Sequence, residues 1–188
     1  MTDIIILAAG SSSRLGKPKQ NLIYKGQTLL QKAIETAIAS VCREVIVVLG
    51  ANSGVIRPNI ENKPVHIIHN ADWEEGMALS IRLGVTELKK NPETDSVLLM
   101  LCDQPFVQTA LLDQIIQAKS KKGIVACVYN DTIGPPVLFD KKYFDELLLL
   151  KGQEGAKKLL LKYTDDVATI PFPLGSVDID TREDFEKL

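Results

Sequence analysis

The sequence is poor in the residues that usually build metal sites and disulfide frameworks. It has three cysteines and two histidines among 188 residues, and no cysteine pair has metal-ligand spacing. His66 and His69 lie three apart in a segment that reads as a strand, so their side chains would face opposite sides and could not chelate one ion together. We therefore expect three reduced, mostly buried thiols, as in a cytoplasmic protein.

The sequence also lacks a strong excess of charge and any long apolar run. Its formal net charge is −2 and its pI is about 5.7, which argues against a general surface for nucleic acid or for anionic membranes. No apolar run is long enough to cross a bilayer, and no signal-peptide pattern precedes the first one. No repeat, low-complexity segment or composition shift divides the chain. With 45% apolar residues, it is expected to form one globular domain over residues 1–188.

Short apolar runs alternate with amphipathic segments through the first two thirds of the chain. Residues 45–49 and 97–101 show no polar alternation, which is typical of strands buried on both faces of a parallel sheet. Helical spacing of apolar residues recurs in segments 29–38, 77–90 and 109–121, and Thr28 can cap the first of these helices. A weaker helical segment is expected over 55–62 and a short helix over 153–163, and Thr181 with Asp184 loosely fits a capping box for a terminal helix. The pattern predicts an α/β fold with a mostly parallel sheet covered by helices on both sides. Residues 134–136 are expected to form a stiff turn that leads into an extended segment at 137–139.

The loop after the first apolar run carries the clearest sign of a ligand. Residues 4–9 are apolar, and they lead into a stretch with two glycines, three serines and the cations Arg14, Lys17 and Lys19. Small residues let backbone N–H groups converge on an anion, and the cations add positive charge to the same loop. We therefore expect this loop to bind the triphosphate tail of a nucleotide.

This loop is neither of the two common phosphate-binding motifs. In the P-loop, Gly-Lys is followed by Ser or Thr, whereas Pro18 follows here. Gly10 and Gly16 have no glycine between them, which is the wrong spacing for the dinucleotide fingerprint. The sequence also shows no set of nucleophile, histidine and acid. A reaction at this loop would therefore depend on positioning and charge neutralisation rather than on a protein nucleophile.

Two acidic segments offer metal ligands. Asp103 comes directly after an apolar run, and Asp178 and Asp180 lie near the C-terminus, two apart and so on one side of an extended segment. Ligands bind at the carboxyl ends of parallel strands, and magnesium takes one or two carboxylates together with substrate phosphate. The sequence therefore predicts a metal site at Asp103 and Asp180. The alternative is a turn former at the first position and a helix N-cap at the second.

The succession of motifs resembles the nucleotidyltransferases of the molybdenum-cofactor type, and among them the cytidylyltransferases. The motifs appear in the family's order and span the chain. They are Leu-Ala-Ala-Gly-x-Ser-x-Arg-Leu-Gly-x-Pro-Lys at 7–19, Asn-x-x-Trp-x-x-Gly-Met-x-x-Ser at 70–80, Cys-Asp-Gln-Pro at 102–105, Gly-Pro-Pro at 134–136, Gly-x-x-Gly-Ala at 152–156 and Asp-Ile-Asp-Thr at 178–181.

The resemblance implies a Rossmann-like three-layer sandwich of the nucleotide-diphospho-sugar transferase type. It also implies magnesium-dependent transfer of CMP from CTP to the terminal phosphate of a molybdopterin-type cofactor, with release of pyrophosphate. The implied catalytic residues are Arg14, Lys19 and Asp103, and the implied Mg²⁺ ligands are Asp103 and Asp180. The implied nucleotide-binding residues are Leu7, Ala8, Ala9, Gly10, Ser12, Arg14, Lys19, Asn70, Gly76 and Ser80. The resemblance further implies transient contact with a molybdoenzyme or its chaperone.

Departures from the family pattern leave alternatives open. Gln20 and Asn21 stand where apolar residues are more frequent, and Gln153 stands where the family has Asp, so the acceptor is not fixed. The nucleotide donor is then CTP or GTP. Ala9 favours CTP, because guanylyltransferases often have Gly at this position. The acceptor is the molybdenum cofactor or a sugar or alcohol phosphate. A nucleotide-binding chaperone without chemistry is a further alternative. Trp73 either stacks on a base or pterin or fills the gap between loop and sheet.

Overall fold

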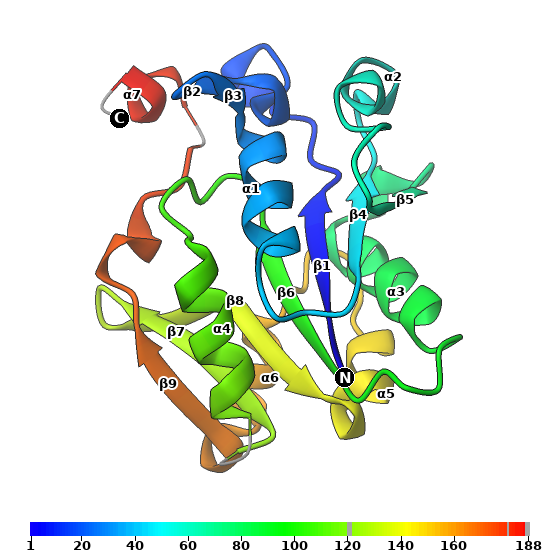
Figure 1. Cartoon of the computed structure of the whole chain (residues 1–188), viewed down its shortest axis with the longest axis vertical. Coiled ribbons are helices and arrows are strands. Elements are labelled where there is room, and N and C mark those ends of the chain that lie inside the picture. The colour runs from blue at the N-terminus through cyan, green and yellow to red at the C-terminus, as the bar shows by residue number, and fades with distance from the viewer. Residues whose placement is uncertain (120–121, 180, 187–188) are drawn as a thin grey trace.

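The computed structural model describes residues 1–119, 122–179 and 181–186; Asp180 and the side chains of Arg14 and Arg182 lie outside this description. A seven-stranded sheet forms the middle layer, in the order β5-β4-β1-β6-β8-β7-β9 (Figure 1). Its strands are β1 (Thr2–Ala8), β4 (Val45–Leu49), β5 (His66–His69), β6 (Ser96–Leu101), β7 (Ile124–Tyr129), β8 (Thr132–Asp140) and β9 (Val167–Pro171). A separate two-stranded ribbon joins β2 (Ile23–Tyr24) to β3 (Gln27–Thr28).

Helices cover both faces of this sheet, as the alternating pattern predicted. One apolar cluster joins Ile4 and Ile6 of β1 to the helices α1 (Leu29–Ile38) and α4 (Thr109–Ala118). A second cluster joins Ile5 to α3 (Met77–Leu88), α5 (Phe144–Leu148) and α6 (Lys157–Lys162) on the opposite face. Since neighbouring residues of β1 point into different clusters, the strand is apolar throughout. The three-layer sandwich with a mostly parallel sheet is therefore confirmed.

The prediction of a turn at residues 134–136 was wrong. These residues lie inside β8, which runs antiparallel to both β6 and β7. The β7 register passes from Ala126 opposite Val137 to Cys127 opposite Gly134, so Pro135 and Pro136 form a bulge that has no counterpart on β7. Proline has no amide hydrogen to donate to a ladder, and a bulge is a position in a strand that tolerates this loss. The turn lies just before, at residues 130–131.

The helix boundaries were predicted well for the long helices and less well for the short ones. Thr28 caps α1 as expected, because its Oγ1 accepts from the amide of Gln31 at 3.0 Å while the Gln31 side chain accepts from the Thr28 amide at 3.0 Å. The helix expected over residues 153–163 begins only at Lys157, since residues 151–156 form a loop that contacts the start of α3. The segment at 55–62 is reduced to α2 (Ser53–Ile56) and a 3₁₀ turn.

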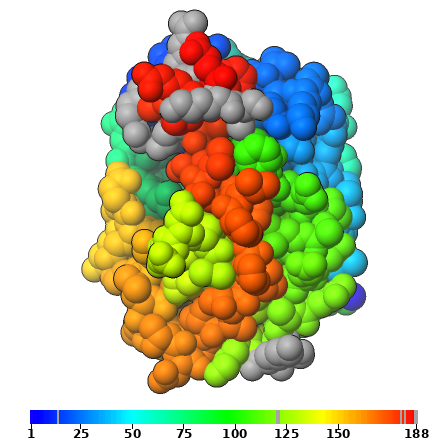
Figure 2. Space-filling view, turned by 90° about the vertical axis from the view of Figure 1, so that its left-hand side faces the viewer, coloured from blue at the N-terminus to red at the C-terminus, as the bar shows by residue number. Residues whose placement is uncertain are grey.

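The C-terminal segment returns to the loop that follows β1. Figure 2 shows the chain after β9, coloured from orange to red, running up this face of the molecule towards its top. Ile179 is fully buried in a small cluster with Leu22 and Leu29, and Phe185 of α7 (Arg182–Glu186) packs against the same cluster. The Thr181 amide donates to Asp184 Oδ2 at 2.8 Å, and the Asp184 amide donates to Thr181 Oγ1 at 3.2 Å, so the predicted capping box is present.

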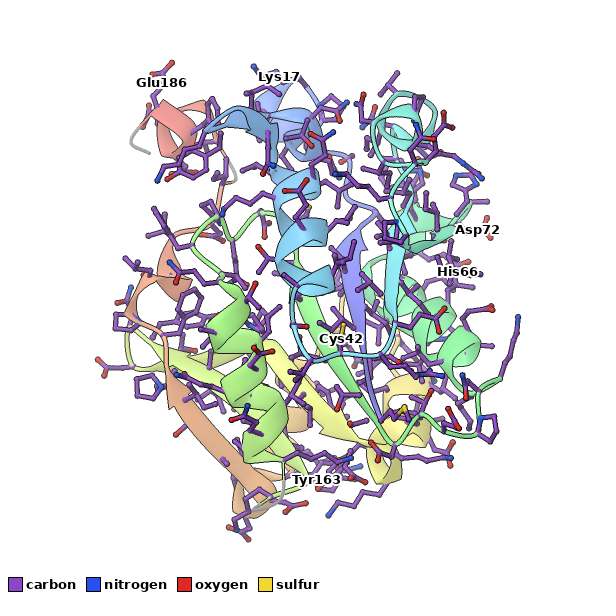
Figure 3. The ribbon with its side chains drawn as sticks, in the orientation of Figure 1. Lys17, Cys42, His66, Asp72, Tyr163 and Glu186 are labelled. Atoms are coloured by element: carbon purple, nitrogen blue, oxygen red, sulfur yellow. The ribbon has the colours of Figure 1, made fainter. Side chains whose placement is uncertain are left out.

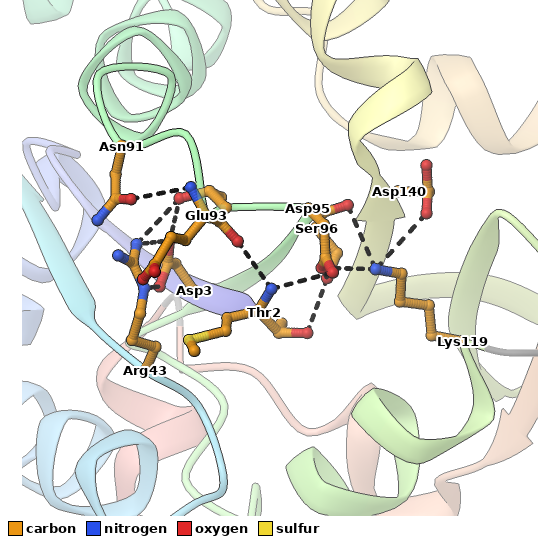
Figure 4. A network of polar contacts seen from close by, with 11 residues as sticks. Thr2, Asp3, Arg43, Asn91, Glu93, Asp95, Ser96, Lys119 and Asp140 are labelled. Atoms are coloured by element: carbon orange, nitrogen blue, oxygen red, sulfur yellow. Dashed lines mark hydrogen bonds and ion pairs between the residues drawn. The ribbon is translucent and has the colours of Figure 1, made fainter.

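A polar network fixes the amino end of the sheet (Figure 4). Asp3 is fully buried and accepts from Arg43 Nε at 2.9 Å and from Thr94 Oγ1 at 2.7 Å. Next to it, Asp95 Oδ1 accepts from Lys119 Nζ at 2.6 Å and holds the terminal amino group at 2.9 Å through Oδ2. Each buried charge in this network has a partner, and we assign it a structural role.

The three cysteines are free thiols, as expected from the sequence. Cys102 and Cys127 are buried free thiols, and burial raises the pKa of each to about 12. Cys42 is also a free thiol and is half-buried. In the described residues, no helix is both long enough and apolar enough to span a membrane.

Acid is expected to weaken the junction between β9 and the turn before α5. Ion pairing with Lys142, together with hydrogen bonds from Tyr143 and the Gly123 amide, holds the pKa of Asp166 well below its usual range. A carboxyl group whose pKa is lowered by folding stabilises the protein above its unfolded pKa of about 3.9, and this stabilisation is lost as the pH falls further. The free energy of unfolding of wild type should therefore exceed that of Asp166→Asn at pH 6, and the two values should converge towards pH 2.

Urea unfolding at several pH values measures this convergence. Asp165→Asn is the matched control, because the neighbouring Asp165 contributes its backbone carbonyl, rather than its carboxylate, to the bond from Lys122. A stability gap between wild type and Asp166→Asn that stays constant with pH would contradict the expectation.

Candidate functional site

A cleft of about 290 Å³ opens at the carboxyl ends of β1 and β6. Its lining comes from four parts of the chain: the end of β1 with the loop that follows, the 3₁₀ turn before α3 together with the start of α3, the end of β6 with the residues directly after it, and the loop before α6. This is the edge of an open α/β sheet at which ligands bind. The lining includes Leu7, Ala8, Ala9, Gly10, Ser11, Lys19, Gln20, Trp73, Glu74, Gly76, Met77, Ser80, Asp103 and Gln153.

Strand register brings the two main motifs together. Leu7 of β1 pairs with Leu101 of β6 near the carboxyl ends of both strands. The loop that starts at Gly10 and the segment that holds Asp103 therefore leave the sheet side by side. Because this pairing depends on which strands are neighbours, the sequence order alone does not specify it.

Lys19 and Asp103 form an ion pair inside the cleft. Lys19 Nζ contacts Asp103 Oδ2, although the residues are 84 positions apart, and their side chains are only 16% and 11% exposed. The other carboxylate oxygen, Asp103 Oδ1, is buried and has no hydrogen-bond partner among the described residues. A buried, unpartnered anionic oxygen is costly, so the cleft is arranged to receive a positively charged or donating group at this position.

Gln20 holds the first loop in shape, and the sequence analysis did not foresee this. The side chain is fully buried, and its Nε2 donates to the carbonyls of Ala8 at 2.9 Å and of Gly10 at 3.0 Å. Ser12 Oγ accepts from the Lys19 amide at 3.0 Å, which closes the loop on itself. The signal in the sequence was an amide side chain where apolar residues are more frequent.

The turn before α3 and the loop before α6 pack tightly against each other at the start of α3. Gly76 has φ +109°, and a Cβ on it would lie 2.3 Å from the carbonyl oxygen of Gly152. The amide of Ala78 donates to the same carbonyl at 3.1 Å. Asn70 is buried, donates to Ser80 Oγ at 2.9 Å and accepts from the Asp72 amide at 3.1 Å. Ser80 and Gly76 thus line the cleft, whereas Asn70 supports the lining from behind.

Trp73 lies at the edge of the cleft with its side chain half-buried. A Cβ on Gly50 would come within 2.6 Å of Trp73 Cβ and 2.7 Å of the Ala9 carbonyl oxygen. Only glycine at position 50 therefore allows the tryptophan turn and the first loop to approach this closely. Trp73 therefore lines the cleft next to the first loop, and stacking of its ring on a ligand stays a prediction.

The structure describes only some of the remaining residues that the sequence predicted for the site. Asp180 and the side chain of Arg14 lie outside the described residues. The amide of Ile179 donates to the Asp103 carbonyl at 3.1 Å, so the second acidic segment does run beside the first. Lys17 is exposed at the end of the molecule, and His66 projects from the edge strand β5, away from the cleft (Figure 3).

The oxygen atoms in the cleft suit a metal ion that takes most of its ligands from the substrate. In the described part of the chain, no group of three or more histidine, cysteine, aspartate and glutamate side chains is placed to hold a metal. Asp103 nevertheless lines the cleft, and its Oδ1 is a hard oxygen with no hydrogen-bond partner among the described residues. Magnesium and manganese accept one or two carboxylates and take their other ligands from phosphates and water. The residues present therefore fit a divalent cation bound together with a nucleotide.

Comparison with known proteins identifies the family. Residues 4–167 match the MobA-like NTP transferase domain. The molybdenum cofactor cytidylyltransferase of Escherichia coli is 27% identical over 187 residues, which cover 97% of this chain and 93% of that protein. The nicotine blue oxidoreductase of Paenarthrobacter nicotinovorans is 33% identical over 135 residues, 71% of this chain but only 65% of that protein.

Solved structures agree with this assignment. Rv0371c from Mycobacterium tuberculosis superposes with a TM-score of 0.89 and 31% identity, over 99% of this chain and 95% of that one. Another structure of that protein is a complex with manganese; it superposes with a TM-score of 0.85 and 28% identity, over 100% of this chain and 97% of that one. Because the matched domain spans most of the sequence, this chain belongs to the MobA-like NTP transferase family.

Proposed function

We propose that this chain is a magnesium-dependent cytidylyltransferase that moves CMP from CTP to the terminal phosphate of a molybdopterin-type cofactor. The observation that carries the proposal is the pairing of Lys19 with Asp103 in the cleft, while the other oxygen of Asp103 has no hydrogen-bond partner in the part of the chain that the structure describes. A cation for the triphosphate and a carboxylate for a metal are the two groups that nucleotidyl transfer needs from the protein.

The reaction exchanges one phosphoanhydride for another. An oxygen of the acceptor phosphate attacks the α-phosphorus of CTP, and the bond from that phosphorus to the bridging oxygen of the β-phosphate breaks, so that pyrophosphate leaves. Lys19 neutralises charge on the phosphates, and the loop ordered by Gln20 presents backbone groups to the nucleotide. Asp103, with Asp180 as its proposed partner, would hold Mg²⁺, which supplies further charge neutralisation when it is bound.

The choice of donor and acceptor rests on the relatives and on one position of the first loop. The similarity to the Escherichia coli cytidylyltransferase covers nearly the whole of both proteins. Ala9 lines the cleft where guanylyltransferases often have glycine, which favours cytosine over the larger guanine. Both observations support CTP and a cofactor acceptor.

Pyrophosphate release is the direct test. It is measured with CTP, GTP, ATP and UTP in turn, with Mg²⁺, with and without molybdenum cofactor. Cofactor-dependent release from CTP alone supports the proposal. Release from another nucleotide keeps the mechanism and changes the donor, whereas tight CTP binding with no release under any condition favours a non-catalytic chaperone.

A redox activity is a second candidate, because the matched relative with the highest identity to this chain among those above is an oxidoreductase. The discriminating measurement is oxidation of NADH or NADPH at 340 nm with a quinonoid dye as the electron acceptor. Turnover in that assay, with no pyrophosphate release from any nucleotide, would replace the transferase proposal.

Replacing Gln20 by leucine is expected to lower kcat/KM for CTP about 30-fold. Leucine has a similar volume but cannot donate to the carbonyls of Ala8 and Gly10, so the loop loses two buried hydrogen bonds next to the nucleotide. Steady-state kinetics measures the loss. Gln114→Leu, at an exposed position of α4, is the control. Wild-type kinetics for Gln20→Leu would show that the loop does not depend on this side chain.

A further inference from the structure

The segment after β6 holds a second buried polar side chain, Gln104, to which the proposed reaction gives no role. It follows Asp103 directly and is buried. Its Nε2 donates to the carbonyl of Pro135 at 3.2 Å and to the carbonyl of Gly175 at 3.0 Å. These carbonyls lie 31 and 71 positions further along the chain. One amide group therefore joins three segments: the residues after β6, the bulge of β8 and the 3₁₀ turn after β9.

The two donated bonds fix the orientation of the Gln104 amide. Its other polar atom, Oε1, is buried and has no hydrogen-bond partner among the described residues. Turning the amide over would set this oxygen against the two carbonyl oxygens, which can only accept hydrogen bonds. The side chain thus serves as a donor to the backbone, and it holds the Pro135 and Gly175 carbonyls close to the end of β6.

The turn after β9 also fits closely against Tyr129 of β7. A Cβ on Gly175 would lie 2.5 Å from Tyr129 Cδ1 and 2.5 Å from Phe172 Cδ1. A Cβ on Gly134, in the neighbouring strand, would lie 2.4 Å from the Tyr129 hydroxyl oxygen. Since backbone and ring are packed this tightly, the turn has little room to shift. Its position depends on Gln104 on one side and on Tyr129 on the other.

The turn after β9 leads directly into the second acidic segment. The Ile179 amide, four positions after Gly175, donates to the carbonyl of Asp103 at 3.1 Å. This segment is therefore bonded to the chain after β6 at two places, with Asp178 between them and Asp180 next in the sequence. Magnesium requires oxygen ligands at about 2.1 Å with little variation. A small displacement of the segment would therefore spoil a metal site that it shares with Asp103.

We propose that Gln104 is a positioning residue, which holds the second acidic segment beside Asp103 and thereby sets the affinity of the site for a divalent cation. This inference rests on the proposed nucleotidyl transfer, because it takes the acidic segment to be part of the metal site. Gln104 is not among the described residues that line the cleft. It acts through the two carbonyls that it holds, rather than by contact with a substrate.

Hydrogen exchange tests the position of the acidic segment without any turnover. In Gln104→Leu the side chain keeps a similar volume but donates to neither carbonyl. We expect the Ile179 amide to exchange about tenfold faster than in wild type. The amides of β1 should keep their protection, which reports that the variant is folded. Gln108→Leu, at an exposed position four residues further on, is the matched control.

Titration with Mn²⁺ in the presence of CTP is the second readout. Gln104→Leu should weaken Mn²⁺ binding about tenfold, as loss of an outer support of a metal ligand does. At limiting Mg²⁺ the kcat for pyrophosphate release should fall by a similar factor and recover at high Mg²⁺, whereas the KM for CTP should change by less than about threefold. A loss of stability alone would not move the metal dependence.

Gly175→Ala perturbs the same junction from its other side and leaves Gln104 intact. The added Cβ meets the ring of Tyr129, so the turn has to shift, and the same two effects are expected. This variant supplies the test if Gln104→Leu loses the protection of β1. Ser176→Ala is its control, because it changes the next residue of the turn and removes only a bond to the Pro173 carbonyl.

The outcomes separate this inference from the proposed reaction. Wild-type exchange of the Ile179 amide, or wild-type Mn²⁺ affinity, in the folded variants would overturn the role of Gln104 even if CTP releases pyrophosphate. Faster exchange together with weaker Mn²⁺ binding supports it, and both are measured without turnover. If both are found while no nucleotide releases pyrophosphate, the proposed transfer fails, and Gln104 still positions a metal-binding segment.

Discussion

Asp103→Asn is expected to lower kcat for pyrophosphate release by about 10³-fold or more. The substitution keeps the shape of the side chain but removes the charge that pairs with Lys19 and leaves no anionic oxygen for a metal. The KM for CTP should change much less than kcat, because other residues of the cleft are proposed to contact the base and ribose. Steady-state release of pyrophosphate over a range of Mg²⁺ concentrations measures both constants.

The control for this variant is a surface aspartate of the same chemistry. Asp145 is 86% exposed and pairs with Lys89 on the protein surface, so Asp145→Asn should keep wild-type turnover. Direct titration with Mn²⁺ in the presence of CTP adds a readout that does not depend on turnover. If Asp103→Asn bound Mn²⁺ as wild type does and retained a tenth of its activity, Asp103 would not be the metal ligand.

Lys19→Met should change nucleotide turnover and metal binding in opposite directions. Loss of the cation is expected to lower kcat/KM for CTP by about 10²-fold, because the phosphates lose a charged donor. In the absence of nucleotide, Lys19 instead occupies an oxygen of Asp103 and competes with a cation for that carboxylate. Removing it should therefore strengthen Mn²⁺ binding to the free protein by roughly threefold or more.

The opposite signs make this prediction specific to the ion pair. Mn²⁺ affinity is measured by electron paramagnetic resonance or calorimetry without nucleotide, and turnover is measured separately. Lys25→Met, at an exposed position in the turn between β2 and β3, is the matched control for loss of one positive charge. Weaker Mn²⁺ binding by Lys19→Met would mean that the lysine supports the metal site rather than competing for it.

The fold could be predicted from the sequence because its signals are local. Uninterrupted apolar runs such as residues 45–49 mark strands that helices cover on both faces, and Thr28 marks the start of α1 by its own side-chain chemistry. Residues 134–136 of β8 were misjudged for a related reason. Glycine and two prolines usually mark a turn, and only pairing with β6 and β7 turns them into a bulge within a strand.

The sequence by itself determined the layers of the fold and identified Lys19 and Asp103 as site candidates. These predictions depend only on residue type, position after a strand and the order of the motifs, which can be read directly from the sequence. Tertiary structure decided which groups meet. The pairing of β1 with β6 brings Lys19 to Asp103 across 84 positions, and burial turns Gln20 into the support of the loop. Distances between residues far apart in sequence depend on strand order and packing, and no local pattern encodes them.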